Sequence, residues 1–154
     1  MDLELKAADD NYLRFAWSLF GDFIRQNMFS GASGRHSPND WNEEAEFHKF
    51  SDYWKANDQH IITVDGKPIG WASIHKLPKK VVIDNWQLVP EWRNRGVTKI
   101  ILGDLVPKWK AAGLEVETSI LQQANLTSVA ERLVTKLGFS TDRVEEHSKI
   151  MRAV

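Results

Sequence analysis

The sequence predicts a mixed α/β (α+β) fold with a mostly antiparallel central sheet of six to seven strands flanked by about four helices. Three observations predict it. A helical stripe of apolar side chains covers residues 13–28, three apolar runs separated by short turns cover residues 60–89, and a strand–helix–strand unit follows over residues 81–121. Because such a unit joins parallel strands, the centre of the sheet is expected to be partly parallel. Residues 1–154 are predicted to form a single domain.

The N-terminal part is predicted to contain a short strand at residues 3–7 and two helices. The apolar face of the first helix, within residues 9–29, comprises Leu13, Ala16, Trp17, Phe20, Phe23, Ile24 and Met28. A loop rich in Gly and Ser is expected at residues 30–40. The second helix then begins with Asp40 as its N-cap and Glu43 as the partner in a capping box. The apolar face of this helix comprises Phe47, Phe50 and Trp54.

The middle of the chain is predicted to form three sequential antiparallel strands, because short turns at DGKP and PKK separate its apolar runs. The three strands are expected at residues 60–64, 69–77 and 81–89. A helix follows from near Gly96 to Gly113 and contains Pro107. We expect the proline to kink this helix without ending it, because Gly103 lies four residues earlier and leaves space for the ring.

The C-terminal part is predicted to contain a strand at residues 114–121, a helix at residues 127–137 and two final strands. Gly138 is the expected stop of the helix. The final strands are expected at residues 139–143 and 148–154.

Composition excludes several classes of function. The chain has no cysteine, which removes thiolate zinc sites and cysteine nucleophiles and is compatible with a cytoplasmic location. A net charge of -1 and scattered basic residues predict no nucleic-acid partner. No apolar stretch approaches the length of a membrane span, and the acidic N-terminus lacks the layout of a secretion signal, so no membrane partner is expected. No spacing of His, Asp and Glu indicates a metal site.

The segment PEWRNRGVTKI, residues 90–100, places two arginines and a glycine between a strand and a helix. The free N–H groups and the positive end of the helix dipole make such a junction suited to bind an anion. Gly96 lets the backbone approach a phosphate closely, and Asn94 tolerates the left-handed conformation that turns the loop. An exposed loop whose arginines only face water is the alternative interpretation.

The stretch WQLVPEWRNRGVTKIIL resembles the acyl-CoA signature of the GCN5-related N-acetyltransferases (GNAT), with Arg93, Gly96 and Thr98 at the three signature positions. The ending KLGF, residues 136–139, is similar to the family's motif after its last helix, and the order of predicted elements matches the family over nearly the whole chain. The resemblance implies a GNAT-like fold and the use of acetyl-CoA, as acyl donor, with an amine acceptor.

The resemblance also implies which residues bind the coenzyme. Backbone N–H groups of residues 93–98, here called the cradle, would hold the diphosphate, and main-chain groups of Leu88 and Val89 would pair with the pantetheine arm. The cradle comprises Arg93, Asn94, Arg95, Gly96, Val97 and Thr98. Asn125 fits the asparagine that the family often has after its fifth strand, although counting back from Gly138 favours Thr127.

This chain departs from the family pattern at the residue that protonates the leaving thiolate. Many relatives have a tyrosine where this chain has Val134. Its only tyrosines, Tyr12 and Tyr53, lie in the first two predicted helices and are interpreted as packing residues. The thiolate of CoA is a fair leaving group without assistance, and water or another donor can also take the place of the tyrosine.

Asp84 is the candidate general base for the amine. If Trp86 and Leu88 share a face of their strand, the alternation of side chains puts Asp84 on that face too, nearest to the expected acyl group. The alternative is that Asp84 only hydrogen-bonds a neighbouring loop or lies exposed. His75 on the preceding strand is the second catalytic candidate, because imidazole titrates near neutral pH.

Two tryptophans are candidates for contact with the acceptor. In the family that the chain resembles, the first two helices and their loop form one wall of the acceptor site, so Trp41 and the loop before it are expected there, with Trp86 as a second aromatic contact. The leading hypothesis is therefore an acyl-CoA-dependent N-acetyltransferase that acts by direct attack. A non-catalytic module that retains the fold is the alternative. The resemblance is also compatible with a homodimer, because the family often pairs through its last strands.

Overall fold

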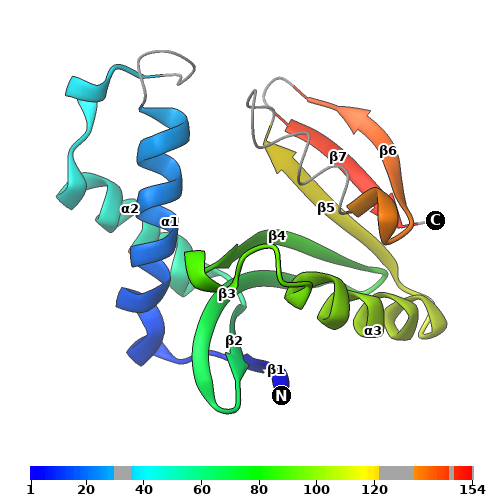
Figure 1. Cartoon of the computed structure of the whole chain (residues 1–154). Helices are drawn as coiled ribbons and strands as arrows, with labels where there is room; N and C mark the ends of the chain where they lie inside the picture. The colour runs from blue at the N-terminus through cyan, green and yellow to red at the C-terminus, as the bar shows by residue number, and fades with distance from the viewer. Residues whose placement is uncertain (30–35, 122–133, 146–147, 154) are drawn as a thin grey trace.

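The computed structural model describes residues 1–29, 36–121, 134–145 and 148–153. Its centre is a seven-stranded sheet in the order β1-β2-β3-β4-β5-β7-β6 (Figure 1). The strands are β1 (Leu3–Ala7), β2 (Gln59–Val64), β3 (Lys67–Lys76), β4 (Lys80–Leu88), β5 (Glu115–Leu121), β6 (Phe139–Val144) and β7 (Ser148–Ala153). Among the strand pairs of the described residues, β4–β5 alone is parallel, as the strand–helix–strand unit predicted.

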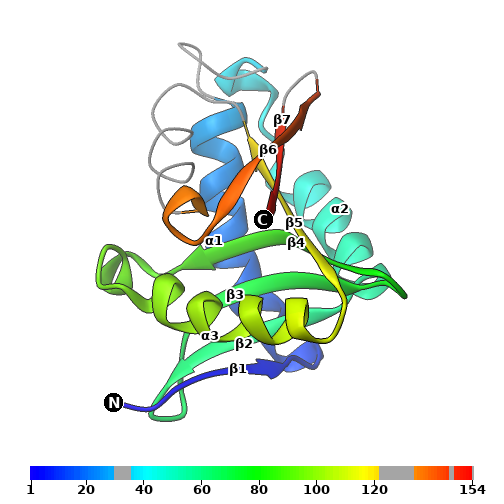
Figure 2. The ribbon, with the colours of Figure 1, turned by 90° about the vertical axis from the view of Figure 1, so that its right-hand side faces the viewer.

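Helices cover both faces of the sheet (Figure 2). The α-helices of the described residues are α1 (Leu13–Met28), α2 (Glu43–Ala56) and α3 (Val97–Ala111). The helix predicted at residues 127–137 lies largely outside the described residues, and residues 134–136 are helical. Together with the sheet, these elements confirm the predicted fold class.

Alternation along β2 explains how the two faces are filled. Ile61 packs with Trp17 of α1 and Phe50 of α2, whereas its neighbour Ile62 packs with Val97 of α3. Side chains of successive strand residues point to opposite faces, so the apolar residues of β2 contribute to the hydrophobic cores on both sides of the sheet. The start of α3 is thereby fixed against the sheet.

The cap of α2 differs from the prediction. Asn42, not Asp40, is the N-cap, and its side chain accepts a hydrogen bond from the Ala45 N–H at 2.9 Å. Asp40 instead closes a short 3₁₀ turn, where its carboxylate accepts from the Ser37 N–H at 3.2 Å. The backbone at Trp41 is extended, which moves the helix start two residues along the chain from the predicted cap.

The helix α3 continues past Pro107, as predicted, and Gly103 lies four residues before it inside the same helix. Gly113 follows the helix with a φ of 82°, the left-handed conformation that suits a C-terminal stop.

Strands β4 and β5 pair over only four residues each, from Lys80 opposite Glu115 to Ile83 opposite Thr118. The Thr118 hydroxyl donates to the Ile83 carbonyl at 3.0 Å at the end of this pairing. Beyond it the two strands continue without pairing to each other and diverge (Figure 1).

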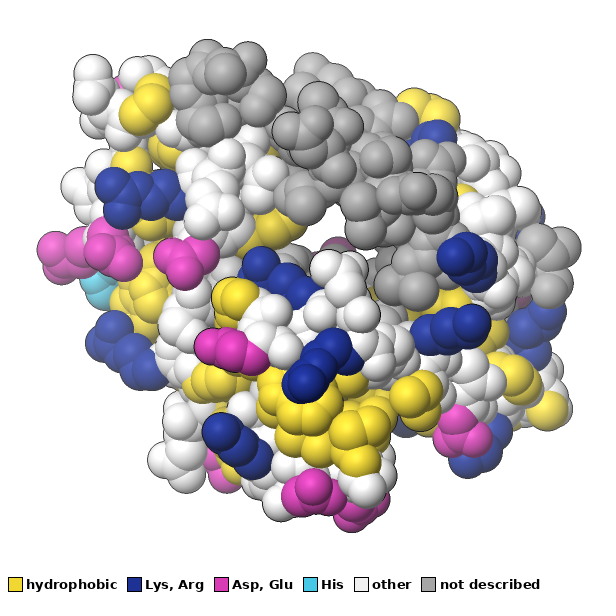
Figure 3. Space-filling model, in the orientation of Figure 1, with side chains coloured by type: hydrophobic (Ala, Val, Ile, Leu, Met, Phe, Trp, Pro, Cys, Tyr) yellow, Lys and Arg dark blue, Asp and Glu magenta, His cyan; other side chains and the backbone are white. Residues whose placement is uncertain are grey.

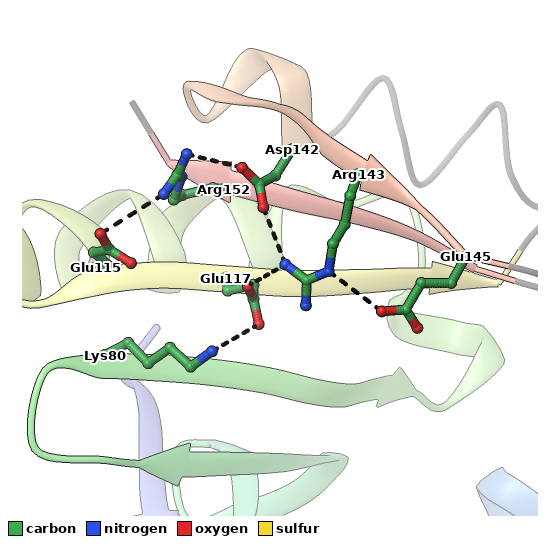
Figure 4. A network of polar contacts seen from close by, with 7 residues as sticks. All are labelled: Lys80, Glu115, Glu117, Asp142, Arg143, Glu145 and Arg152. Atoms are coloured by element: carbon green, nitrogen blue, oxygen red, sulfur yellow. Dashed lines mark hydrogen bonds and ion pairs between the residues drawn. The ribbon is translucent and has the colours of Figure 1, made fainter.

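Ion pairs join β4, β5, β6 and β7 near the segment where β4 and β5 pair. Figure 4 shows this network, which comprises Lys80, Glu115, Glu117, Asp142, Arg143, Glu145 and Arg152. Glu117 of β5 contacts Lys80 of β4 at 3.5 Å and Arg143 of β6 at 3.3 Å. Single exposed ion pairs contribute about 0–1 kcal/mol each. A connected set such as this one therefore adds modestly to holding β4 and the β6–β7 hairpin to β5.

Candidate functional site

The loop between β4 and α3 has the backbone that the sequence predicted. After a 3₁₀ turn at Pro90–Trp92, Asn94 adopts a left-handed φ of 61° and Gly96 a φ of 81°. An added Cβ at Gly96 would meet nothing within 4 Å, so open space lies over this part of the cradle. The two positive φ angles turn the chain into α3 with its first N–H groups uncovered.

The N–H groups of residues 94–98 have no acceptor within the part of the chain that the structure describes. The Arg93 N–H differs, because it donates to the Pro90 carbonyl at 3.2 Å. The first turn of α3 contains no acidic residue and Gly96 provides no side-chain cap, so the positive end of the helix dipole is not neutralised locally. Five adjacent free amides at a helix start suit an anion.

The two arginines lie differently, although both are exposed. The Arg93 Nε donates to the Leu88 carbonyl at 3.0 Å, which places this guanidinium over the end of β4. The Arg95 guanidinium stacks on the Trp92 ring at 4.6 Å from its centroid. Both charges are therefore held near the cradle by identified contacts.

The outer edge of β4 adjoins the cradle. The Val89 N–H donates to the Ile69 carbonyl at 2.8 Å, and its carbonyl accepts from the Trp92 N–H at 3.0 Å. Because backbone groups alternate between the two edges of a strand, those of Leu88 and Trp86 point away from β3. Both main-chain groups of Val89 are thus engaged within the fold. The main-chain groups of Leu88 point away from β3, but its carbonyl already accepts from the Arg93 Nε, so the Leu88 N–H is the group left at this edge.

The face drawn in Figure 3 is hollowed near its middle, and dark blue Lys or Arg side chains lie beside the hollow.

Trp86 and Thr98 tie α3 to β4. The Trp86 indole N–H donates to the Thr98 hydroxyl at 2.8 Å, and the ring packs with the cores beneath α3. Thr98, which takes the place of a small signature residue, therefore uses its hydroxyl as an acceptor inside the protein.

The expectation that Asp84 shares a face with Trp86 and Leu88 is wrong. Ser73 pairs with Asn85 and Ile74 with Ile83, so Asp84 has no partner residue on β3 and forms a β-bulge. The extra residue shifts the alternation of side chains. Asp84 consequently faces α2, while Trp86 packs on the α3 side.

Asp84 lies in a polar cluster with Tyr53 of α2. The Tyr53 hydroxyl hydrogen-bonds the Asp84 carboxylate, lies 2.8 Å from the Ser73 hydroxyl and accepts from the Asn85 amide at 3.0 Å. Burial, and secondly the hydrogen bond with Asp84, raise the pKa of Tyr53 well above its usual range. The interpretation of Tyr53 as a packing residue is therefore incomplete.

His75 is near this cluster, as a candidate catalytic residue should be. Its Nε2 lies 3.8 Å from the Asp84 Oδ2, beyond hydrogen-bond distance, and both side chains are partly exposed. The structure thus brings the two predicted catalytic residues together through the β3–β4 pairing.

Trp41 lies in an aromatic cluster of the helical face. Its ring stacks on Trp17 at 6.3 Å between centroids and meets Phe29 edge-on at 5.1 Å. The ring is half-buried, which leaves part of it available to a ligand. Contact with an acceptor remains a prediction for both Trp41 and Trp86.

Two other expectations concern the C-terminal half. Asn125 and Thr127 lie outside the described residues. Val134, at the position of the family's tyrosine, is half-buried and packs against the core beneath α3.

Among the described residues, no group of three or more His, Asp or Glu side chains is placed to hold a metal ion. None of the described helices combines the length and apolar character needed to cross a membrane.

A sheet that splits after a short parallel pair, beside a helix that begins in an arginine and glycine loop, defines an N-acetyltransferase fold. The model of the acetyltransferase (GNAT) family matches residues 25–139, and the chain belongs to this family. The resemblance noted in the sequence is thereby confirmed. No curated protein sequence matches the chain significantly.

Solved structures support the same fold. PaiA N-acetyltransferase from Thermoplasma acidophilum, in complex with coenzyme A, aligns over 99% of each chain with a TM-score of 0.66 and 16% identity. A GNAT family acetyltransferase from Elizabethkingia anophelis with acetyl-CoA bound aligns over 98% of this chain and 97% of its own, with a TM-score of 0.63 and 10% identity. The ribosomal-protein-S18-alanine N-acetyltransferase from Escherichia coli aligns over 99% of this chain and 93% of its own, with a TM-score of 0.62 and 16% identity.

Proposed function

We propose that this protein transfers an acetyl group from acetyl-CoA to a primary amine of a small molecule, peptide or protein, by direct attack in a ternary complex. The observation that carries the proposal is the row of free amides at residues 94–98, next to the free edge of β4. Membership of the GNAT family and neighbours solved with coenzyme A or acetyl-CoA support it.

The cradle suits the diphosphate of the coenzyme. Free backbone N–H groups of residues 94–98 and the dipole of α3 favour negative charge, and the guanidinium groups of Arg93 and Arg95 lie beside them. Gly96 leaves room for a phosphate above the backbone. Binding in this way is local, so it is compatible with the net charge of -1.

The edge of β4 suits the pantetheine arm. An arm extended from the cradle would meet the outward N–H of Leu88, whose carbonyl already accepts from Arg93, and then the outward backbone groups of Trp86. The four residue-to-residue steps from Leu88 to Asp84 span about 13 Å of strand. The acyl group would therefore come to the bulge, where a main-chain N–H of β4 can stabilise the charge that develops on its oxygen.

Asp84 is the proposed base, with His75 as a neighbour that can assist. Removal of a proton leaves the lone pair of the amine nitrogen free to attack the acyl carbon, and the bond to sulfur breaks with its electrons on the sulfur. A thiolate is a fair leaving group, so water can replace the tyrosine that Val134 displaces. The chain has no cysteine to form an acyl-thioester enzyme, which supports direct attack.

The test is acetyl-CoA binding followed by turnover. Saturating acetyl-CoA should raise the melting temperature through preferential binding to the native state. Release of the CoA thiol can then be followed with a thiol-reactive chromophore, because the protein has no cysteine to react with it. We expect an amine-dependent rate that Asp84→Asn lowers about 100-fold or more.

Two results would contradict parts of this proposal. An unchanged melting temperature at a large excess of acetyl-CoA would contradict the coenzyme site. Full activity of Asp84→Asn would remove Asp84 from the role of base. Binding without turnover of any amine would instead support the alternative of a non-catalytic module, for which the replacement of the family's tyrosine by a packed Val134 is the favouring observation.

A further inference from the structure

The Tyr53 side chain of α2 reaches the sheet, where its hydroxyl hydrogen-bonds Asp84, the proposed base. We infer that Tyr53 is a positioning residue that holds the Oδ2 atom of Asp84 and leaves the Oδ1 atom to take the proton of the attacking amine. The inference rests on the proposed function and assigns Tyr53 a part in it.

The hydrogen bonds around Tyr53 can be satisfied in one way. A phenol has a single proton, and the carboxylate of Asp84 is the strongest acceptor in reach, so the proton is donated to Asp84. The Ser73 hydroxyl at 2.8 Å and the Asn85 amide at 3.0 Å must then donate to the Tyr53 oxygen. Ser73 is fully buried, and its contact with Tyr53 therefore satisfies a polar group that would otherwise be costly inside the sheet.

The two oxygens of Asp84 are in different surroundings. Oδ2 accepts a hydrogen bond from the Tyr53 hydroxyl. It also lies 3.4 Å from the Asn85 amide nitrogen and 3.8 Å from His75 Nε2. Oδ1 has no polar partner within the described ranges, and 37% of the Asp84 side chain is exposed. Oδ1, which is not among the buried unpaired side-chain atoms of the described residues, is thus the oxygen of this partly exposed side chain that is available to an incoming amine.

The bulge is what makes this arrangement possible. Asp84 and Asn85 follow each other in β4, yet both reach the Tyr53 hydroxyl, because the extra residue interrupts the normal alternation. Tyr53 itself is held by its helix, whose neighbouring residues Phe50 and Trp54 are almost fully buried. A rigid donor at this point restricts the rotation of the Asp84 side chain.

Tyr53 also stays a donor over the working pH range. Burial and the neighbouring carboxylate raise the pKa of Tyr53, so the phenol keeps its proton near neutral pH. The proton that leaves the amine therefore goes to Oδ1, while the Tyr53 proton remains in its bond to Oδ2.

The first test compares Tyr53→Phe with Tyr12→Phe. Tyr12 is the other tyrosine of the chain and lies before α1, with Lys6 over its ring at 5.5 Å. We expect Tyr53→Phe to lower kcat about 10- to 100-fold, as misplacement of a catalytic group does, with an unchanged KM for acetyl-CoA. Tyr12→Phe should retain the wild-type kcat. A kcat of Tyr53→Phe within twofold of the wild type would overturn the inference.

The second test asks whether Tyr53 acts through Asp84. In the Asp84→Asn background, Tyr53→Phe should cause no further loss of kcat, because its effect requires the carboxylate. An equal loss in both backgrounds would mean that Tyr53 only supports the fold, and would also overturn the inference.

A third measurement does not depend on activity. The Tyr53 hydroxyl can be followed at neutral pH by NMR of a ¹³Cζ-tyrosine label, and Asp84→Asn should shift the Tyr53 ¹³Cζ resonance because the hydrogen bond to the carboxylate is removed. An unchanged resonance would disprove the contact, even if Tyr53→Phe failed to fold. A wild type that binds acetyl-CoA without turnover would contradict the proposed function, and this spectrum would then decide the Tyr53–Asp84 contact separately.

Discussion

At Gly70, a single added methyl group should disturb both the packing of the sheet and the outer edge of β4 that is proposed to bind the coenzyme. It lies on β3 opposite Leu88. An added Cβ would stand 2.6 Å from the Leu88 Cδ2, 2.7 Å from the Gln87 carbonyl oxygen and 3.1 Å from the Ile62 Cδ1. The Leu88 methyl can rotate away, whereas the carbonyl oxygen belongs to the backbone of β4 and moves only with the strand.

The expected cost of Gly70→Ala follows from these contacts. Overpacking of this kind costs about 1–3 kcal/mol, and the lower entropy of the unfolded alanine chain offsets about 0.4–1 kcal/mol. The difference is roughly 0–2.6 kcal/mol, and because one of the close contacts is with the backbone of β4, we expect the free energy of unfolding to fall by about 1–2.5 kcal/mol. Because β4 must shift at Leu88, acetyl-CoA affinity should fall as well.

Urea unfolding, followed by tryptophan fluorescence, measures the first effect, and calorimetric titration with acetyl-CoA measures the second. Gly103→Ala is the matched control, because this residue lies inside α3 and an added Cβ there meets nothing within 4 Å. Alanine is the better helix former by about 1 kcal/mol, so this variant should be more stable than the wild type. A Gly70→Ala protein as stable as the wild type would refute the packing argument.

Two further predictions concern the cradle and the tyrosine. Gly96→Ala should lower the free energy of unfolding by about 1 kcal/mol because of its left-handed φ, and should lower acetyl-CoA affinity about tenfold or more. Gly66→Ala is the control, because Gly66 has a φ of 82° in a turn and its replacement should cost the same stability and leave the affinity unchanged. Equal affinities of the two variants in calorimetry would remove Gly96 from the cradle. The raised pKa of Tyr53 means that the unfolded chain loses this proton first, so stability should fall as the pH rises above about 10, by at most about 1.4 kcal/mol per pH unit. Urea unfolding across this range should give a shallower decline for Tyr53→Phe, and identical slopes would contradict the buried hydrogen bond.

Local patterns were sufficient to predict most of the fold. The strands β2 to β4 are long apolar runs bounded by turns, and their observed ends lie close to the predicted ones. The parallel β4–β5 pair follows from the strand–helix–strand crossover through α3. The positive φ of Asn94 follows from the tolerance of asparagine for the left-handed region. Each of these features depends on neighbours in the sequence, which is why the sequence alone predicts them.

The features that the sequence did not predict depend on distant partners. Tyr53 and Asp84 are 31 residues apart, and only the packing of α2 on the sheet brings them together. The bulge at Asp84 has no local signal such as a glycine, so a regular alternation predicted the wrong face for this side chain. The cap of α2 was misplaced because Asp40 and Asn42 are both good capping residues, and the extended backbone at Trp41 decides between them.

The central claim is that free amides at the start of α3 bind a diphosphate. Calorimetric titration of the wild type with acetyl-CoA, its 3′-dephospho form and S-acetylpantetheine tests this most directly, because only the last compound lacks the diphosphate. We predict one site per chain, similar affinity for the first two ligands and about 100-fold weaker binding of S-acetylpantetheine. Equal affinity for all three, or no binding of acetyl-CoA, would contradict the claim.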